Sequence, residues 1–158
     1  MAARPSLLQR ELKQQKPFTP TDEALLALMR TSDLIRRKIG VVVEREGITL
    51  QQYNVLRILR GAGASGCPTL DIGDRMIEHA PGITRLVDRL ERAGLAQRRR
   101  CTEDRRQVFC EITPAGLALL ERLEGPMLEA KRAAVRGLSL AEQKQLITLL
   151  ERLRSVED

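Results

Sequence analysis

The chain has 158 residues and a formal net charge of +6, with a sequence pI of about 9.8. This length can bury a sizeable core as one domain, and the basic balance favours an acidic partner. Uncharged apolar runs such as Ile39–Val43 are far shorter than the roughly 20 residues of a membrane span. No secretory leader pattern is present, so we expect a cytoplasmic protein without a membrane anchor.

Residues that usually bind metals are scarce. The three cysteines (Cys67, Cys101 and Cys110) form no CxxC pair, and His79 is the single histidine. An odd number of cysteines without that spacing argues against a disulfide framework and a structural zinc site. We therefore expect no metal and no cofactor.

A long helix is predicted near the start of the chain. Thr19-Pro20 supplies an N-cap and a first-turn proline, and Gly47 ends the pattern after Glu46. Between them apolar residues recur every three or four positions, which predicts one buried face. That face is expected to contain Leu25, Leu28, Met29, Ser32, Ile35, Ile39, Val42 and Val43.

Two further helices are predicted at the end of the chain. Thr113-Pro114 begins one that continues to about Arg136 and is expected to bend at Pro126. Ser139–Glu142 fits a capping box and begins a last helix that ends near Ser155. The expected buried face of the first consists of Leu117, Leu120, Leu123, Met127, Ala130 and Ala134.

The middle of the chain predicts a helix-turn-helix. A capping box at Thr49–Gln52 begins a helix that stops at Gly61, and a loop of small residues, Gly61–Pro68, follows. Thr69 is expected to cap a short helix to about residue 77. After a turn at residues 78–80, Pro81 begins a second short helix that ends near residue 93. Two short helices joined by a tight turn are typical of this motif.

An arginine-rich stretch lies between Arg85 and Arg106. It holds eight arginines and four acidic residues, so it carries a net +4 of the chain's +6. Within it, Leu95–Arg100 and Gln107–Ile112 are predicted to pair as two strands of a hairpin across the turn Cys101–Arg106.

The helix and the hairpin together favour a nucleic-acid site over a merely solvated charged surface. The second helix of a helix-turn-helix enters the major groove, so Thr84, Arg85 and Arg89 are candidates to read bases. We expect Asp104 to orient a neighbouring arginine by a charge-assisted hydrogen bond. The arginines expected at phosphates or in a minor groove are Arg98, Arg99, Arg100, Arg105 and Arg106.

Four motifs follow one another here: Ile83–Glu91 (ITRLVDRLE), Gly94-Leu95, Asp104-Arg105-Arg106 and Thr113–Gly116 (TPAG). Their order and spacing resemble the signature of the MarR family of winged helix-turn-helix transcription regulators. The resemblance extends from about residue 19 to residue 155. Gly82 and Ala96 depart from the family pattern, which usually has a small polar residue and a larger aliphatic there. A hydroxyl contact to DNA is therefore in doubt at Gly82.

The resemblance implies a mainly α fold with a small β wing, in one domain over residues 1–158. Residues 49–113 would form the winged helix-turn-helix lobe, and residues 19–46 and 114–156 the dimerisation helices. It also implies a homodimeric, sequence-specific transcription regulator, a repressor of a palindromic double-stranded DNA operator released by a small organic effector. The apolar surface of the long helices independently favours a dimer, with a monomeric core as the alternative. The operator, the regulated genes, the effector and its binding residues, and repression versus activation stay open.

Two other classes of function remain to be compared. An arginine-rich hairpin would also suit a sequence-tolerant DNA-compacting protein. An enzyme is disfavoured because we find no catalytic residues, no nucleophile–base pair and no phosphate-binding loop. A turn centred near residue 103 would place Cys110 opposite Gln97 rather than Cys101, which argues against a disulfide in the hairpin. A redox role for Cys67, Cys101 or Cys110 stays open, with incidental cysteines as the alternative.

Overall fold

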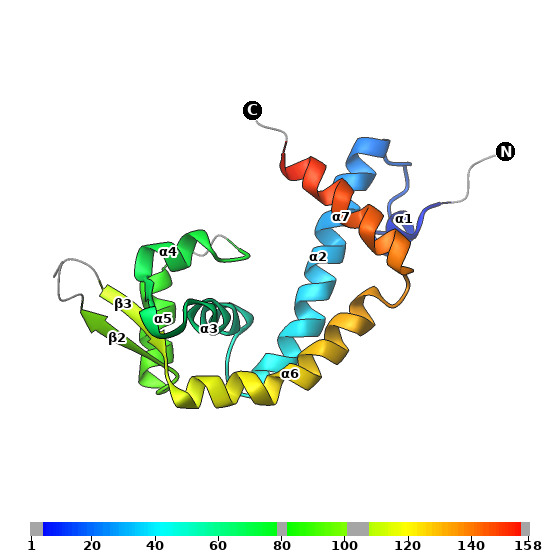
Figure 1. Cartoon of the computed structure of the whole chain (residues 1–158). Coiled ribbons are helices and arrows are strands. Elements are labelled where there is room, and N and C mark those ends of the chain that lie inside the picture. Colours follow the sequence, from blue (N-terminus) through cyan, green and yellow to red (C-terminus); the bar gives the residue numbers. More distant parts are fainter. Residues whose placement is uncertain (1–4, 79–81, 101–107, 156–158) are drawn as a thin grey trace. The chain divides into compact units, whose positions relative to one another are not determined.

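The computed structural model describes residues 5–78, 82–100 and 108–155. The described residues form helices and one small three-stranded antiparallel sheet, which confirms the predicted mainly α fold with a β wing (Figure 1). The chain divides into two compact units, Met1–Lys38 and Ile39–Asp158. Some sequence predictions concern residues outside these ranges: the turn at Cys101–Arg106, Pro81 as the first residue of the second short helix, and His79.

The first unit contains α1 (Leu7–Glu11) and most of α2 (Pro20–Glu44). As predicted, the Thr19 hydroxyl caps α2, since it accepts a hydrogen bond of 3.2 Å from the backbone N–H of Asp22. The predicted buried face is wrong for the first half of α2, because periodicity identifies an apolar face but not what covers it. The exposed residues of that face are Leu25, Leu28, Met29 and Ser32.

The second unit begins with the last turns of α2. Thr49 and Ser139 form the capping boxes that the sequence predicts, and α6 continues through Pro126. The helices of this unit are α3 (Leu50–Ala62), the short 3₁₀ helix η1 (Gly63–Ser65), α4 (Thr69–Asp74), α5 (Ile83–Arg92), α6 (Pro114–Val135) and α7 (Leu140–Arg154).

The sheet consists of β1 (Cys67–Pro68), β2 (Ala96–Arg100) and β3 (Val108–Ile112) in the order β1-β3-β2. Strands β2 and β3 are the predicted hairpin, whereas β1 lies in the stretch predicted as a loop of small residues. Two residues, one of them proline, are too few to show a strand period. Arg98, rather than the predicted Gln97, lies opposite Cys110.

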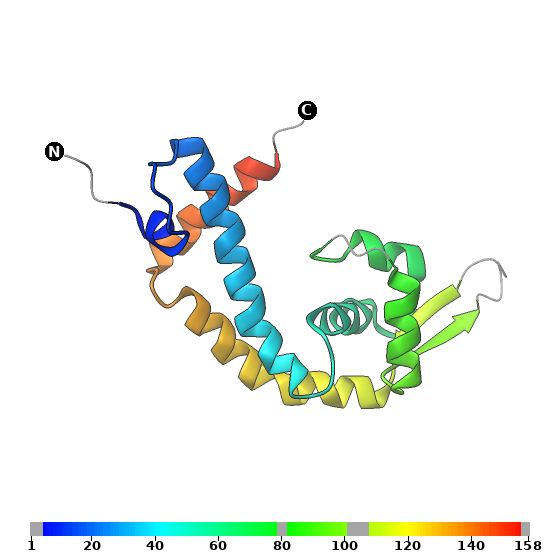
Figure 2. The ribbon, with the colours of Figure 1, turned by 180° about the vertical axis from the view of Figure 1, so that it is seen from behind.

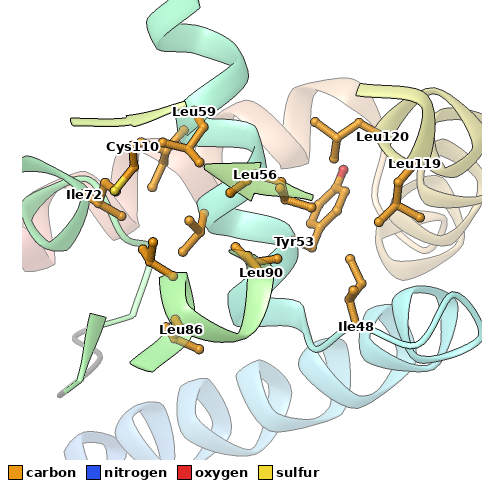
Figure 3. Packing of buried hydrophobic residues seen from close by; sticks show 14 of the residues in the cluster. Ile48, Tyr53, Leu56, Leu59, Ile72, Leu86, Leu90, Cys110, Leu119 and Leu120 are labelled. Carbon is orange, nitrogen blue, oxygen red and sulfur yellow. The ribbon is translucent and has the colours of Figure 1, made fainter. Parts of the chain in front are cut away.

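One core of mostly aliphatic side chains, with Tyr53 among them, fills the second unit (Figure 3). Leu56 and Leu59 of α3, Leu90 of α5 and Leu120 of α6 are fully buried. Helix α5 lies beside β2, and α3 packs against both α5 and β3, so the core fixes the helix and the hairpin on a common base (Figures 1 and 2).

The helix-turn-helix differs in detail from the prediction. Helix α4 ends at Asp74 rather than near residue 77. Helix α5 begins at Ile83, directly after Gly82, which adopts a left-handed conformation with φ of 95°. Thr69 is the first residue of α4 and not its cap, because β1 leads directly into the helix. Its hydroxyl instead donates a hydrogen bond of 3.3 Å to the carbonyl of Val108 in β3.

The start of α6 is joined to the end of α5 by the TPAG motif. The backbone N–H of Thr113 donates to the carbonyl of Leu95 at 3.1 Å, and its hydroxyl donates to the carbonyl of Gly94 at 2.6 Å. The same hydroxyl accepts from the N–H of Gly116 at 3.1 Å, which caps α6. Thr113 therefore ties the turn after α5 to the first turn of the long helix.

Candidate nucleic-acid interface

Helix α5 is amphipathic, and its outer face carries the predicted base-reading residues. Its inner face buries Leu86, Val87 and Leu90 in the core. Thr84, Arg85 and Arg89 are exposed. Within the described ranges, the side chains of these three residues form no hydrogen bond or ion pair with the rest of the chain. Their donors are therefore available to an external partner.

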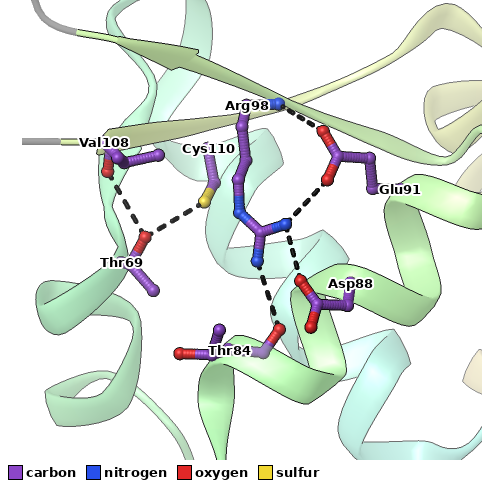
Figure 4. A network of polar contacts seen from close by, with 7 residues as sticks. All are labelled: Thr69, Thr84, Asp88, Glu91, Arg98, Val108 and Cys110. Carbon is purple, nitrogen blue, oxygen red and sulfur yellow. Dashed lines mark hydrogen bonds and ion pairs between the residues drawn. The ribbon is translucent and has the colours of Figure 1, made fainter.

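Arg98 of β2 faces α5 and is bound by it (Figure 4). One guanidinium nitrogen lies 2.7 Å from Asp88 Oδ1 and 2.7 Å from Glu91 Oε2, and the other donates to the carbonyl of Thr84 at 3.2 Å. The backbone N–H of Arg98 donates to Glu91 Oε1 at 3.2 Å. Burial alone would lower the pKa of Arg98, but the hydrogen bonds to the two carboxylates outweigh it and raise the pKa above its ordinary value.

Arg99 lies on the opposite face of β2 and contacts β3. Its Nε donates to Glu111 Oε1 at 2.6 Å, its guanidinium lies 5.6 Å from the centre of the Phe109 ring, and one amino group donates to the carbonyl of Ser65 at 3.5 Å. The Gln97 amide also donates to Glu111, at 3.1 Å. Half of the Arg99 side chain (49%) stays exposed, so it can still approach a phosphate.

The pH dependence of stability should report the Arg99–Glu111 pair. The hydrogen bonds from Arg99, and then from Gln97, lower the pKa of Glu111 below 4.5. Because the folded-state pKa is the lower one, the stabilisation is complete above the unfolded-state pKa and is lost as the pH falls through the folded-state value. We expect Glu111→Gln to cost about 0.5–1 kcal/mol at pH 7, with a difference from wild type that shrinks below pH 4.5.

Urea unfolding at a series of pH values measures this difference. Arg99→Met should lower the free energy of unfolding by the same amount at neutral pH. It should also give the same weaker decrease of that free energy at acid pH, because it removes the partner that lowers the pKa of Glu111. If the difference in the free energy of unfolding between wild type and Glu111→Gln grew as the pH fell, the Arg99–Glu111 pair would not be the cause.

The other predicted hairpin residues divide into two groups. Arg100 ends β2 with an exposed side chain that makes no bond to the described part of the chain. Asp104, Arg105 and Arg106 lie outside the described residues. The two acids that bind Arg98 were not among the site residues predicted from the sequence. Asp88 and Glu91 are three residues apart on one face of α5, and this spacing was the signal that could have identified them.

Cys67 and Cys110 are buried, and they lie opposite each other in strands β1 and β3. Burial raises the pKa of Cys110 above its ordinary value, against the opposing effects of the Thr69 hydroxyl and Arg98. A buried thiol of this kind is a poor nucleophile. Cys101 lies outside the described residues. The described residues contain no group of three or more His, Cys, Asp or Glu side chains that could bind a metal ion.

No helix in the described ranges is both long and apolar enough to cross a membrane.

Comparison with known proteins agrees with this geometry. Residues 48–108 match the model of the MarR family. A MarR transcription factor from Planctomyces limnophilus is 40% identical, with a TM-score of 0.67; the match covers 86% of this chain and 98% of that one. The homoprotocatechuate degradative operon repressor of Escherichia coli is 29% identical over 133 residues, which cover 82% of this chain and 86% of the relative.

The structure of the MepR–DNA complex from S. aureus is also similar. It is 25% identical, with a TM-score of 0.75, and the match covers 89% of this chain and 99% of that one. Both the sequence and the fold therefore agree over nearly the full length of these proteins. The chain belongs to the MarR family of transcription regulators.

Proposed function

We propose that the protein is a homodimeric, sequence-specific DNA-binding regulator, a repressor that a small organic effector releases from a palindromic operator in the cytoplasm. The observation that carries this proposal is the outer face of α5, where Thr84, Arg85 and Arg89 are exposed beside an arginine-rich strand. Membership of a family of transcription regulators supports a binding role rather than an enzymatic one.

In this proposal α5 enters the major groove and the hairpin meets the DNA backbone or the minor groove. An arginine can donate two hydrogen bonds to O6 and N7 of a guanine. The exposed Arg85 and Arg89 have the free donors that this requires. The proposed hairpin contacts are Arg99, Arg100, Arg105 and Arg106, with Asp104 orienting one of the arginines.

Apolar side chains that a single chain leaves exposed support the homodimer. In the first half of α2, Leu25, Leu28 and Met29 are 40–68% exposed. In α7 no residue is buried. Its exposed apolar residues are Leu140, Leu146, Ile147, Leu149 and Leu153. Large apolar side chains exposed in this number are typical of a protein interface, and a second copy of the chain is the partner that family membership favours.

The proposed division of the single domain, residues 1–158, follows from these surfaces. Residues 19–46 and 114–156 form the dimerisation region, and residues 49–113 form the DNA-binding lobe. A two-fold dimer would present two α5 helices about 34 Å apart, one turn of DNA. The name of the E. coli relative supports repression. Release by an effector is what family membership implies, and no residues are assigned to the effector.

Footprinting on the DNA upstream of the protein's own coding sequence tests the proposal. We expect a compact protected region of about two helical turns, roughly 20 base pairs, as for a dimer on two half-sites. Protection that spreads along the DNA with rising protein concentration would instead indicate a sequence-tolerant compacting protein.

Replacement of Arg85 by alanine should weaken operator binding and relax specificity. The substitution removes a proposed bidentate base contact, so we expect a loss of about 1–3 kcal/mol at the footprinted site and much less on a scrambled duplex. Arg132→Ala is the matched control, since it removes one exposed arginine from α6 and changes the net charge equally. Equal titration curves for Arg85→Ala and Arg132→Ala would remove Arg85 from the site.

A further inference from the structure

We propose that Arg98 is a positioning residue, which holds strand β2 against helix α5 and so fixes the two proposed DNA contacts relative to each other. The sequence predicts Arg98 at a phosphate or in a minor groove. Here its role is to act through its neighbours. This inference rests on the proposed function, because it concerns how the DNA-binding surface is held in shape.

The contacts of Arg98 span most of α5. Its guanidinium bonds to the carbonyl of Thr84 in the first turn and to Asp88 and Glu91 further along (Figure 4). Thr84, Asp88 and Glu91 belong to three successive turns of the helix. A single side chain from β2 is therefore attached to three turns of α5, which opposes sliding and tilting of the strand against the helix.

Glu91 strengthens the attachment because it binds both the side chain and the backbone of Arg98. Its Oε2 lies 2.7 Å from the guanidinium and its Oε1 accepts from the backbone N–H at 3.2 Å. The strand is thus fixed at its main chain as well as through a long side chain. Arg98 also lies opposite Cys110 in β3, which is fully buried, so this part of the sheet is anchored in the core.

The charges around Arg98 argue against a direct phosphate contact. One cation is shared by two carboxylates, so the cluster of Arg98, Asp88 and Glu91 carries a net negative charge. A phosphate that approached it would meet repulsion and would have to displace existing charge-assisted bonds. The Arg98 side chain is also only 24% exposed, compared with 49% for its neighbour Arg99.

The double variant Asp88→Asn/Glu91→Gln separates the two roles, because they predict opposite results. If Arg98 contacts phosphate, removing the acids frees its guanidinium and adds positive charge, so operator binding should tighten and its salt dependence should steepen. If Arg98 positions the hairpin, operator affinity should fall at least tenfold. Affinity for a scrambled duplex of the same length should stay equal or rise.

The experiment is a titration of both duplexes at two salt concentrations with full-length wild-type and variant proteins. Glu121→Gln/Glu129→Gln on α6 is the matched control, since it neutralises two exposed acids away from α5. It should raise affinity for both duplexes alike. Urea unfolding checks the double variant, and Glu91→Gln alone replaces it if folding fails.

The possible outcomes are distinct. A loss of operator preference in the double variant, at unchanged or higher affinity for scrambled DNA, supports the positioning role. Tighter operator binding overturns it, as does an Arg98→Gln variant whose salt slope falls by about 0.9, the value for one lost phosphate contact. A wild-type chain that prefers neither duplex would overturn the proposed function itself, and this inference with it.

Discussion

Alanine in place of Gly116 is expected to destabilise the protein by about 3 kcal/mol, at the upper end of the usual cost of overpacking. A Cβ atom at this position would overlap the carbonyl oxygen of Leu95 and lie 2.7 Å from Cγ1 of Ile112. The clash with Leu95 involves backbone, which cannot rotate away. That carbonyl also accepts a hydrogen bond from Thr113, so a shift would loosen the connection between α5 and α6.

Gly61→Ala is the matched control for this prediction. Gly61 is an exposed glycine within α3, and a Cβ there would meet no atom within 4 Å. Alanine is the better helix former, so this variant should gain up to about 1 kcal/mol. Urea unfolding of both variants measures the difference. If Gly116→Ala were neutral or stabilising like Gly61→Ala, the close contact between α6 and the turn after α5 would be wrong.

Local signals in the sequence were sufficient to predict where helices α3, α6 and α7 begin. Thr49 and Ser139 form their capping boxes with residues only three positions away, and Thr113 caps α6 in the same local manner. The positive φ of Gly47 likewise agrees with the predicted end of α2. Such features depend on a few neighbouring residues, so they can be predicted without knowledge of the tertiary structure.

Features that depend on distant residues could not be predicted in this way. Strand β1 exists because Cys67 pairs with Cys110, more than forty positions later in the chain. The partners of Arg98 depend on the register of the hairpin against α5, and a shift of one residue turns every side chain of a strand to the other face. The sequence therefore indicated that the site is cationic. It could not show that Arg85 is exposed whereas Arg98 is bound to acidic residues of α5.

Burial of α2 and α7 was unpredictable for a different reason. The apolar period of a helix is the same whether its own chain or a second copy covers it. Leu25 and Met29 remain exposed in the single chain, at 52% and 68%. From one sequence, the signal of an interface is therefore that the helices have more apolar surface than the fold of a single chain can cover.

Replacing Leu149 and Leu153 by glutamate is expected to convert the proposed dimer to monomer and to abolish operator binding. The two residues lie one turn apart on α7, 48% and 58% exposed. Burying a leucine contributes about 1.5–3 kcal/mol. Both side chains are about half covered in the single chain, and a symmetric interface contains each residue twice, so four lost leucines remove roughly 3–6 kcal/mol. The glutamates add the cost of placing charges in an apolar interface. Together these losses would move the dissociation constant of a typical dimer to micromolar concentration or above.

Analytical ultracentrifugation across a concentration series, together with the operator titration, measures this effect. Lys144→Gln/Arg154→Gln changes the net charge by the same amount from the other side of α7, and it should remain dimeric. If the glutamate variant stayed dimeric and bound the operator normally, the interface would lie elsewhere. If it became monomeric yet bound as tightly as wild type, two linked half-sites would not be needed. If a dimer binds the two half-sites of a palindrome with its two lobes, the glutamate variant should be a monomer that no longer binds the operator, and the control should stay dimeric.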